Sequence, residues 1–372
     1  MPNPLEIPNR HRTIPSRDRR MTSMSAISLN GSDQHAHQFE VERTEERWEI
    51  GPGEPRLVEL RSERGESTLE RTSAGLFITA SSLESVPKSS DYGGQAERLL
   101  ARVFDLLPGP HQWRLRRVRS LRKVTIEEES FAREEHYVSL RSDHGLGIVV
   151  PFSDAIDVEI DRQLDRLTVD AEGTEAFDPD VPILWTAGTG SILFHEALGH
   201  PAEVGASPLR WPEWLRVVDD PSGDGLGAME SDDIGLAVYP ADLTAGAIPT
   251  AFRREGYRDS PLRRMTSLRV ELIGPEVESP PDRIEVQHLG GGEWDPVTDR
   301  DAIRVTSAIH VRAGRRRALH PFVWSAQRGD VPGSLVGAAG PARAYPGVLC
   351  RDEGQRIPVG SASPDILTRR PR

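Results

Sequence analysis

The sequence has one cysteine, two lysines (Lys88 and Lys123) and no long apolar run in 372 residues. A single cysteine excludes a disulfide framework and a zinc cluster held by four cysteines. No stretch approaches the roughly eighteen consecutive apolar residues of a membrane-spanning helix, so neither a transmembrane segment nor a membrane partner is expected. Because hydrophobic residues make up only 37% of the chain, the core must be economical.

Positive charge is also scarce, because 46 Lys and Arg stand against 58 Asp and Glu, a net charge of −12. A general nucleic-acid binder needs a basic face that displaces counterions, so we expect no nucleic-acid partner. The 33 glycines and 30 prolines favour turns and short strands over long helices. The length suits two domains, and without a recognisable targeting signal we expect a cytoplasmic protein.

The N-terminal half divides into a tail and a strand-rich domain. Residues 1–38 contain prolines and polar residues without apolar periodicity, which predicts a disordered tail. An α+β domain follows over 39–177. Its patterns predict strands at 57–60, 75–79, 114–126 and 137–140, a turn at 64–66, a hairpin across 142–150 and a helix over 96–107.

The second domain, 178–372, opens with a short apolar run at 181–185 that predicts a buried strand. A glycine turn at 188–190 then leads into a helix. Further strands are predicted at 268–273 and 284–288, with a hairpin across 303–323. Together these patterns predict a two-domain α+β protein with mixed or antiparallel sheets and a β-rich C-terminal domain.

The predicted helix carries a His-Glu-x-x-x-His pattern at His195, Glu196 and His200. A zinc peptidase needs neutral imidazoles to hold the metal and a carboxylate beside the reacting water. On a regular helix, residues five apart lie about 140° apart around the axis, whereas residues four apart lie about 40° apart. The two imidazoles therefore converge only if the helix ends or bulges, as Gly199 and Pro201 favour. The alternative is two helix histidines with unrelated partners.

Cys350 is the candidate third ligand, because a catalytic zinc usually has three protein ligands and one open position. The alternative is that a lone cysteine serves as a small buried apolar residue. If Cys350 is a ligand, its sulfur should lie within about 4–5 Å of both imidazoles even in a metal-free structure.

The segment from Gly190 to Glu203 resembles the His-Glu-Ala-x-Gly-His-x-x-Glu signature of the TldD/PmbA family of zinc peptidases, once called modulators of DNA gyrase. Further blocks follow in the family's order over roughly residues 180–368. They comprise Val-Val-Asp-Asp at 217–220, Asp-Asp-x-Gly at 232–235, an Arg-Met-Thr segment at 264–266, Gly-Gly-Gly-x-x-Asp at 290–295, and Cys-x-x-x-Gly-Gln-x-x-Pro-Val-Gly at 350–360.

The resemblance implies a zinc-dependent metallopeptidase that cleaves small or unfolded peptides. Zn²⁺ would be bound by His195, His200 and Cys350, with Glu196 as the general base on a zinc-bound water. Glu203 would orient a ligand. Because the His-Glu-x-x-x-His pattern is present, the chain resembles the metal-bearing, TldD-type subunit. It would work as a homodimer, or as a heterodimer with a PmbA-type homologue.

Two rival functions stay open: a degenerate subunit that binds peptide or a partner without turnover, and a cysteine hydrolase that uses Cys350 with a histidine. Several other residues have two interpretations. Asp219, Asp220, Asp232 and Asp233 are solvated turn acids or a second cation site. The glycines at 290–292 form a tight strand-end turn or admit a substrate backbone. Arg264 forms a structural ion pair or binds a peptide carboxylate. Trp211 and Trp214 anchor a packed loop or form a platform for the substrate.

Overall fold

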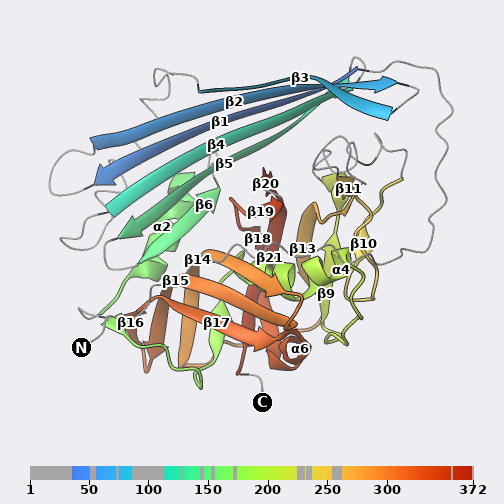
Figure 1. The fold of residues 1–372 in the computed structure, drawn as a ribbon. Helices are drawn as coiled ribbons and strands as arrows, with labels where there is room; N and C mark the ends of the chain where they lie inside the picture. The colour runs from blue at the N-terminus through green and yellow to red at the C-terminus, as the bar shows by residue number, and fades with distance from the viewer. Residues whose placement is uncertain are drawn as a thin grey trace, which may run out of the picture.

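The computed structural model describes residues 36–50, 56–72, 75–85, 113–126, 129–142, 146–151, 156–170, 174–223, 231, 237–253, 262–352 and 355–370. Within these ranges the chain forms two large β-sheets, one lying across the other, with short helices between and beside them (Figure 1). The fold is mixed α+β with mixed and antiparallel sheets, which confirms the predicted class.

The N-terminal sheet is antiparallel throughout its described part, in the order β3-β2-β1-β4-β5-β6. Its strands are β1 (Ala36–Ile50), β2 (Arg56–Thr72), β3 (Gly75–Ser85), β4 (Trp113–Ile126), β5 (Glu129–Ser142) and β6 (Gly147–Pro151). The turn predicted at 64–66 is wrong, because β2 runs straight through it. Gly65 pairs with Val41 on one side and with Leu83 on the other, and two ladders outweigh the weak strand preference of one glycine.

The hairpin predicted across 142–150 is confirmed as the antiparallel pair β5–β6. The Ser142 N–H donates to the Leu146 carbonyl at 2.8 Å, and the Leu146 N–H donates to the Ser142 hydroxyl at 3.1 Å. Strand β1 starts at Ala36, inside the range expected to be a tail. The helix predicted over 96–107 lies outside the described residues.

The second sheet is mixed, and in the described chain it runs β10-β9-β13-β21-β8-β14-β15-β16-β7, with β17 paired to β15 and β18 paired to β21. Its strands are β7 (Thr174–Glu175), β8 (Ile183–Trp185), β9 (Leu215–Asp219), β10 (Ala241–Asp242), β13 (Ser267–Leu272), β14 (Arg283–Asp295), β15 (Arg300–Arg312), β16 (Arg315–Leu319), β17 (Phe322–Gln327), β18 (Leu335–Ala344) and β21 (Gly360–Thr368). The strands predicted at 181–185, 268–273 and 284–288 and the hairpin at 303–323 all lie in this sheet.

Two small hairpins stand apart from the large sheets. They are β11 (Phe252–Arg253) with β12 (Leu262–Arg263), and β19 (Leu349–Asp352) with β20 (Gln355–Pro358). The described helical segments are α2 (Ile156–Leu167), α3 (Gly190–Phe194), the π-helical η1 (His195–Gly199), α4 (His200–Glu203), the 3-10 turns η2 (Pro221–Gly223) and η3 (Arg328–Asp330), and α6 (Val331–Ser334).

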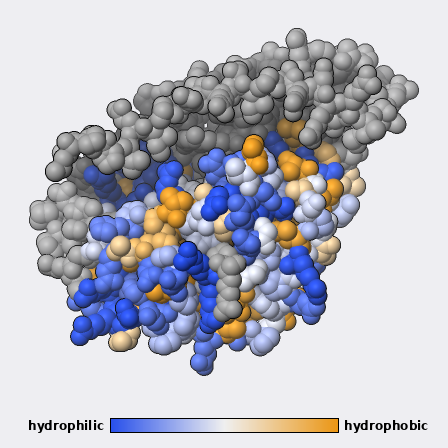
Figure 2. Space-filling view, turned by 60° about the horizontal axis from the view of Figure 1, so that its bottom comes forward, coloured by the Kyte–Doolittle hydropathy of each residue, from blue (hydrophilic) through white to orange (hydrophobic). Residues whose placement is uncertain are grey.

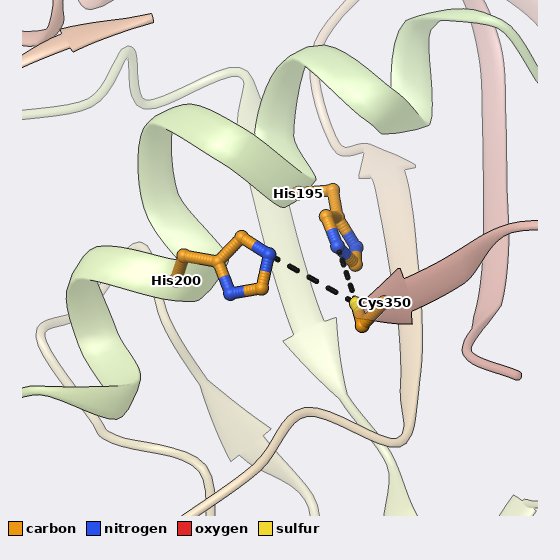
Figure 3. A group of neighbouring side chains, drawn as sticks. All are labelled: His195, His200 and Cys350. Atoms are coloured by element: carbon orange, nitrogen blue, oxygen red, sulfur yellow. Dashed lines mark hydrogen bonds between the residues drawn. The ribbon is translucent and has the colours of Figure 1, made fainter. Parts of the chain in front are cut away.

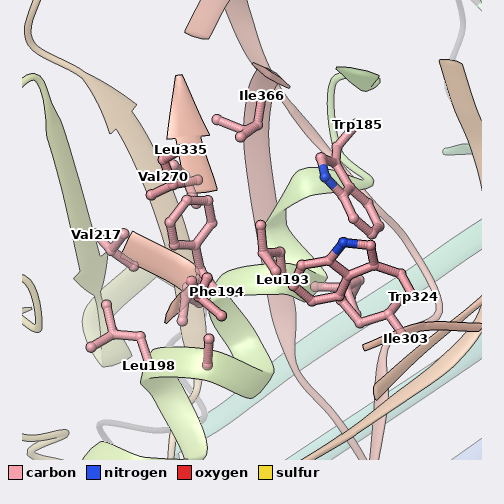
Figure 4. Packing of buried hydrophobic residues seen from close by; sticks show 14 of the residues in the cluster. Trp185, Leu193, Phe194, Leu198, Val217, Val270, Ile303, Trp324, Leu335 and Ile366 are labelled. Atoms are coloured by element: carbon pink, nitrogen blue, oxygen red, sulfur yellow. The ribbon is translucent and has the colours of Figure 1, made fainter. Parts of the chain in front are cut away.

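The main core lies between the second sheet and the helical segments α3 and η1 (Figure 4). Trp185 and Trp324 meet edge to face with ring centroids 5.5 Å apart, and Phe194 packs 5.7 Å from Trp211. Phe194 and Trp185 are completely buried, and truncating a side chain of this kind costs about 3–5 kcal/mol. The core therefore fixes the base of the helical segments that carry both histidines.

Helix α2 joins the two layers. Its buried Ile160 and Leu164 lie in one cluster with Leu140 of β5 and Ile309 of β15. The coloured part of the face shown in Figure 2 is mostly hydrophilic, with apolar residues in small separate patches. Among the described residues, we find no helix with the length and apolarity needed to cross a membrane.

Candidate metal centre

The His-Glu-x-x-x-His pattern lies on a helix that changes its winding. Helix α3 is followed directly by the π-helical segment η1, in which the His200 N–H donates to the His195 carbonyl five residues earlier. The extra residue in this turn is the bulge predicted from the spacing. It places the imidazoles of His195 and His200 with ring centroids 4.7 Å apart.

A glycine is required where the π-helical segment meets the sheet. A Cβ on Gly199 would overlap the Sδ of Met265, which is itself buried. Gly199 therefore lets η1 approach the segment before β13 closely.

Cys350 lies on β19, and its sulfur points toward the two imidazoles that come from the helical segments (Figure 3). Its Sγ lies 3.0 Å from His195 Nε2 and 3.9 Å from His200 Nε2. The three candidate ligand atoms all lie within 4.8 Å of one another. The structure thus brings together residues 155 positions apart in sequence, at the separation expected of ligands to one ion.

Glu203 orients His200 from behind. Its Oε2 accepts a hydrogen bond from His200 Nδ1 at 2.9 Å, and its Oε1 accepts from the Met265 N–H at 2.7 Å. With Nδ1 donating to Glu203, Nε2 is the ring nitrogen of His200 that faces Cys350. A carboxylate on the far nitrogen is the usual support for a metal-binding histidine, so this residue lies where the sequence predicted it.

The donors fit a metal ion in chemistry as well as in position. Two imidazole nitrogens and one thiolate form a set that zinc accepts in catalytic sites, with one position left open. Burial, and then the neighbouring His200, hold the pKa of His195 well below its usual range, so its imidazole is neutral. Burial alone would lower the pKa of His200, but hydrogen bonds with Cys350 and Glu203 outweigh it and raise the pKa to about 11. A proton and a metal ion therefore compete for His200 Nε2.

Glu196 lies beside the cluster rather than in it. Its Oε2 is 4.0 Å from His200 Nε2, and the carboxylate is buried. Burial raises the pKa of Glu196 to about 7, although the charge of His200 and, less, the Trp294 N–H act to lower it. On its other side a Cβ on Gly292 would lie 2.5 Å from Glu196 Oε1, so only glycine leaves the carboxylate room there.

The glycines at 290–292 are not a turn, which corrects one of the two interpretations. They continue strand β14, where Gly291 pairs with Arg304 and Gly292 with Ile303 after several register shifts. All three glycines are exposed. The missing side chains open the strand beside Glu196 rather than ending it.

The interpretation of Asp219 as a solvated acid is also wrong. Its carboxylate is completely buried, and Oδ1 accepts the N–H groups of Thr266 and Ser267 at 2.9 and 3.0 Å. Burial raises its pKa to about 6. Asp220 does form a turn, because its Oδ1 accepts from the Ser222 N–H and hydroxyl. Asp232 and Asp233 lie outside the described residues.

Trp211 is a packed anchor against Phe194, as one interpretation held. Arg264 donates to the Arg263 carbonyl at 3.1 Å.

Asp301, which sequence reasoning missed, is completely buried, and no described residue hydrogen-bonds to its carboxylate oxygens. Burial, and then the charge of Glu196, raise its pKa to about 7. Only its inward place in the alternation of β15 could have indicated it.

No profile of a known protein family matches the chain, and no curated protein sequence matches it either. Solved structures do. TldE from Thermococcus kodakarensis matches with a TM-score of 0.51 at 12% identity, over 90% of this chain and 96% of that one. A candidate modulator of DNA gyrase from Bacteroides thetaiotaomicron matches with a TM-score of 0.50 at 13% identity, over 92% and 96%. At these identities the likeness is one of fold, and it confirms that this chain has the fold of the TldD/PmbA proteins that its motifs resemble.

Proposed function

We propose that the protein is a zinc-dependent metallopeptidase that cleaves small or unfolded peptides. The observation that carries this proposal is the convergence of His195, His200 and Cys350 within 4.8 Å, with the buried Glu196 carboxylate 4.0 Å from His200 Nε2. A cluster of this kind can hold a metal ion. Zinc is the proposed ion because the nitrogen and sulfur donors suit it.

Zinc, when bound, would supply Lewis acidity toward a carbonyl oxygen and lower the pKa of a water molecule. Glu196 Oε2 faces the cluster, so this oxygen would take a proton and return it to the leaving amine. The Trp294 N–H donates to the carboxylate, and Gly292 leaves it room on that side. The exposed glycines of β14 leave room for an extended peptide beside this base.

Metal content and one variant test the proposal together. Freshly purified protein should contain about one zinc per chain. Glu196→Gln should keep that zinc and lose roughly 10²–10⁴-fold in the rate of peptide cleavage, because it removes a proton acceptor but no ligand. Glu278→Gln, on the exposed surface, is the matched control and should change neither quantity.

Two results would contradict this assignment. A zinc content below about a tenth of an ion per chain after zinc supplementation would rule out the proposed metallopeptidase function. Loss of zinc together with activity in Glu196→Gln would make Glu196 a ligand or a structural residue instead of a base.

A cysteine hydrolase is the second candidate, favoured by the 3.0 Å contact between Cys350 Sγ and His195 Nε2. Chelation would leave such an enzyme active, whereas it should inactivate a zinc peptidase. A degenerate subunit that binds peptide or a partner would have no peptidase activity and need not hold stoichiometric zinc. We further propose that the chain works in the cytoplasm as a homodimer, or as a heterodimer with a PmbA-type homologue.

A further inference from the structure

One edge of β14 is without a strand partner over its second half in the described structure. Strand β8 pairs with β14 only from Ile284 to Val286, whereas β15 follows it to Asp295. The Leu289 N–H is taken by the Tyr345 hydroxyl at 2.9 Å. Beyond it, the exposed glycines at 290–292 lead directly to Glu196.

Two arginines from different sheets flank the start of this glycine segment. The Cδ of Arg304, on β15, lies 3.0 Å from the position that a Cβ on Gly290 would take. Thr306 Cγ2 lies 2.9 Å from the same position. Arg141 comes from β5 of the N-terminal sheet and donates to Thr306 Oγ1 at 3.4 Å. Both arginine side chains are exposed.

Neutral groups hold Arg141 in place. Its guanidinium donates to His288 Nδ1 at 2.9 Å, and because a guanidinium has no acceptor, this nitrogen must carry the lone pair. The proton then lies on His288 Nε2, 3.4 Å from the Ser139 hydroxyl. Burial, and then the charge of Arg141, lower the pKa of His288 to about 3, so the imidazole adds no charge of its own.

Neither arginine has an anionic partner in the part of the chain that the structure describes. Elsewhere on the same domain, arginines pair with carboxylates at 2.6–2.8 Å, as Arg283 and Arg316 do with Glu285 and Arg328 does with Asp299. Two exposed arginines without carboxylate partners beside a glycine strand, in a chain of net charge −12, offer a local site for an anion.

We propose that Arg141 and Arg304 bind a carboxylate of a peptide that lies along the Gly290–Gly292 edge of β14. This inference rests on the proposed peptidase function and names its substrate class: short peptides whose carboxylate lies near the scissile bond. Gly290 and Gly292 are two residues apart, about 7 Å along a strand. The carboxylate thus falls two to three residues from the reacting bond. The free C-terminus is the expected source, and an Asp or Glu side chain offers the same chemistry.

Binding to an inactive protein tests this site independently of turnover. The protein is zinc-loaded Glu196→Gln, and the probe is a hexapeptide without acidic side chains, as the free acid and as the C-terminal amide. We expect the acid to bind about 10–100-fold more tightly than the amide in low salt, because charge-assisted hydrogen bonds discriminate by that much. Adding Arg304→Ala or Arg141→Ala should reduce this ratio to about 3 or less.

Two control variants accompany these measurements. Arg315→Ala removes an exposed arginine at the far end of the sheet and should leave the ratio unchanged. Arg141→Lys keeps the charge and should recover part of the preference. The Arg304 side chain makes no described hydrogen bond or ion pair, so we expect Arg304→Ala to leave the strand ladder intact even if Arg141→Ala weakens the contact between the sheets.

An amide probe with glutamate at the penultimate position, compared with its glutamine twin, identifies the source of the carboxylate. If only the glutamate amide binds tightly, and both alanine variants abolish this tight binding, the proposed site is supported with an acidic side chain as its ligand. Equal binding of acid, amide and glutamate probes, or a preference that survives both alanine variants, overturns the site. Absence of cleavage by the wild-type protein would contradict the peptidase but leave these ratios readable.

Discussion

The three donors of the candidate metal centre differ in how the protein holds them. His200 is fixed by Glu203, and His195 lies on the buried face of the π-helical segment. Cys350 is only partly buried and lies on a small hairpin. Its position is therefore the least constrained by packing, and its role is the one that a chemical probe can best decide.

Cys350 should resist thiol reagents in the zinc-loaded protein and react readily after chelation, because a coordinated thiolate is blocked as a nucleophile. Cys350→Ser should lower zinc affinity substantially, since a hydroxyl is a poor zinc ligand at neutral pH. The rate of thiol modification with and without a chelator measures this. A reactivity that chelation does not change, with full zinc in Cys350→Ala, would show that the residue is only a small apolar filler.

At the scale of single elements, the outer half of β14 positions the base as much as the helix does. Gly292→Ala would place a methyl group 2.5 Å from Glu196 Oε1 and displace the carboxylate. Because misplacement of a reacting group by about 1 Å can cost on the order of 10²-fold, we expect kcat to fall by about 10–100-fold with zinc retained. Gly333→Ala, where a methyl group meets open space, is the matched control. Unchanged kcat in Gly292→Ala would show that Glu196 needs no such room.

Asp219, the last residue of β9, is a second buried carboxylate, and its ionisation has a measurable effect on stability. Asp219 has its pKa raised from 3.8 to about 6 by burial, so the folded protein binds this proton more tightly than the unfolded chain. Well below pH 3.8 both states are protonated and nothing is lost. Between pH 3.8 and about 6 the unfolded chain ionises while the folded state keeps its proton, so the free energy of unfolding falls. Above pH 6 the folded state carries a buried charge and the loss is complete at roughly 3 kcal/mol.

Asp219→Asn keeps an oxygen for Thr266 and Ser267 but cannot ionise. The variant should match the wild type in free energy of unfolding near pH 4 and exceed it by roughly 2–3 kcal/mol at pH 7. Urea unfolding at the two pH values measures the difference. A gap that stays constant with pH would mean that Asp219 titrates normally.

These elements also show what sequence reasoning can reach. The bulge at 195–200 was predictable, because a spacing of five between two potential ligands conflicts with regular helix geometry. Glu203 was predictable from its place in the motif. Burial of Asp219 was not, since it depends on the pairing of β9 with β13 nearly fifty residues away. The turn predicted at 64–66 was wrong for the same reason. Pairing of β2 with β1 and β3 outweighs the local preference of Gly65 for a turn.

At the scale of the whole molecule, the proposed homodimer or heterodimer has a measurable consequence. Light scattering should give a mass near twice 41.2 kDa, alone or with a PmbA-type homologue. Dilution should lower the activity per chain if the dimer is required. A monomer that cleaves peptides at full rate would contradict the proposed dimer.

The hairpin β19–β20 is a two-stranded sheet separate from the large one, and such hairpins are marginally stable alone in water. A metal held by His195, His200 and Cys350 would tie this hairpin to a helix 155 residues earlier. In polymer terms the ion would be a reversible cross-link closing a long loop, as a disulfide does in secreted proteins. A chain with one cysteine would thus have a cross-link that depends on the supply of free metal and needs no second cysteine.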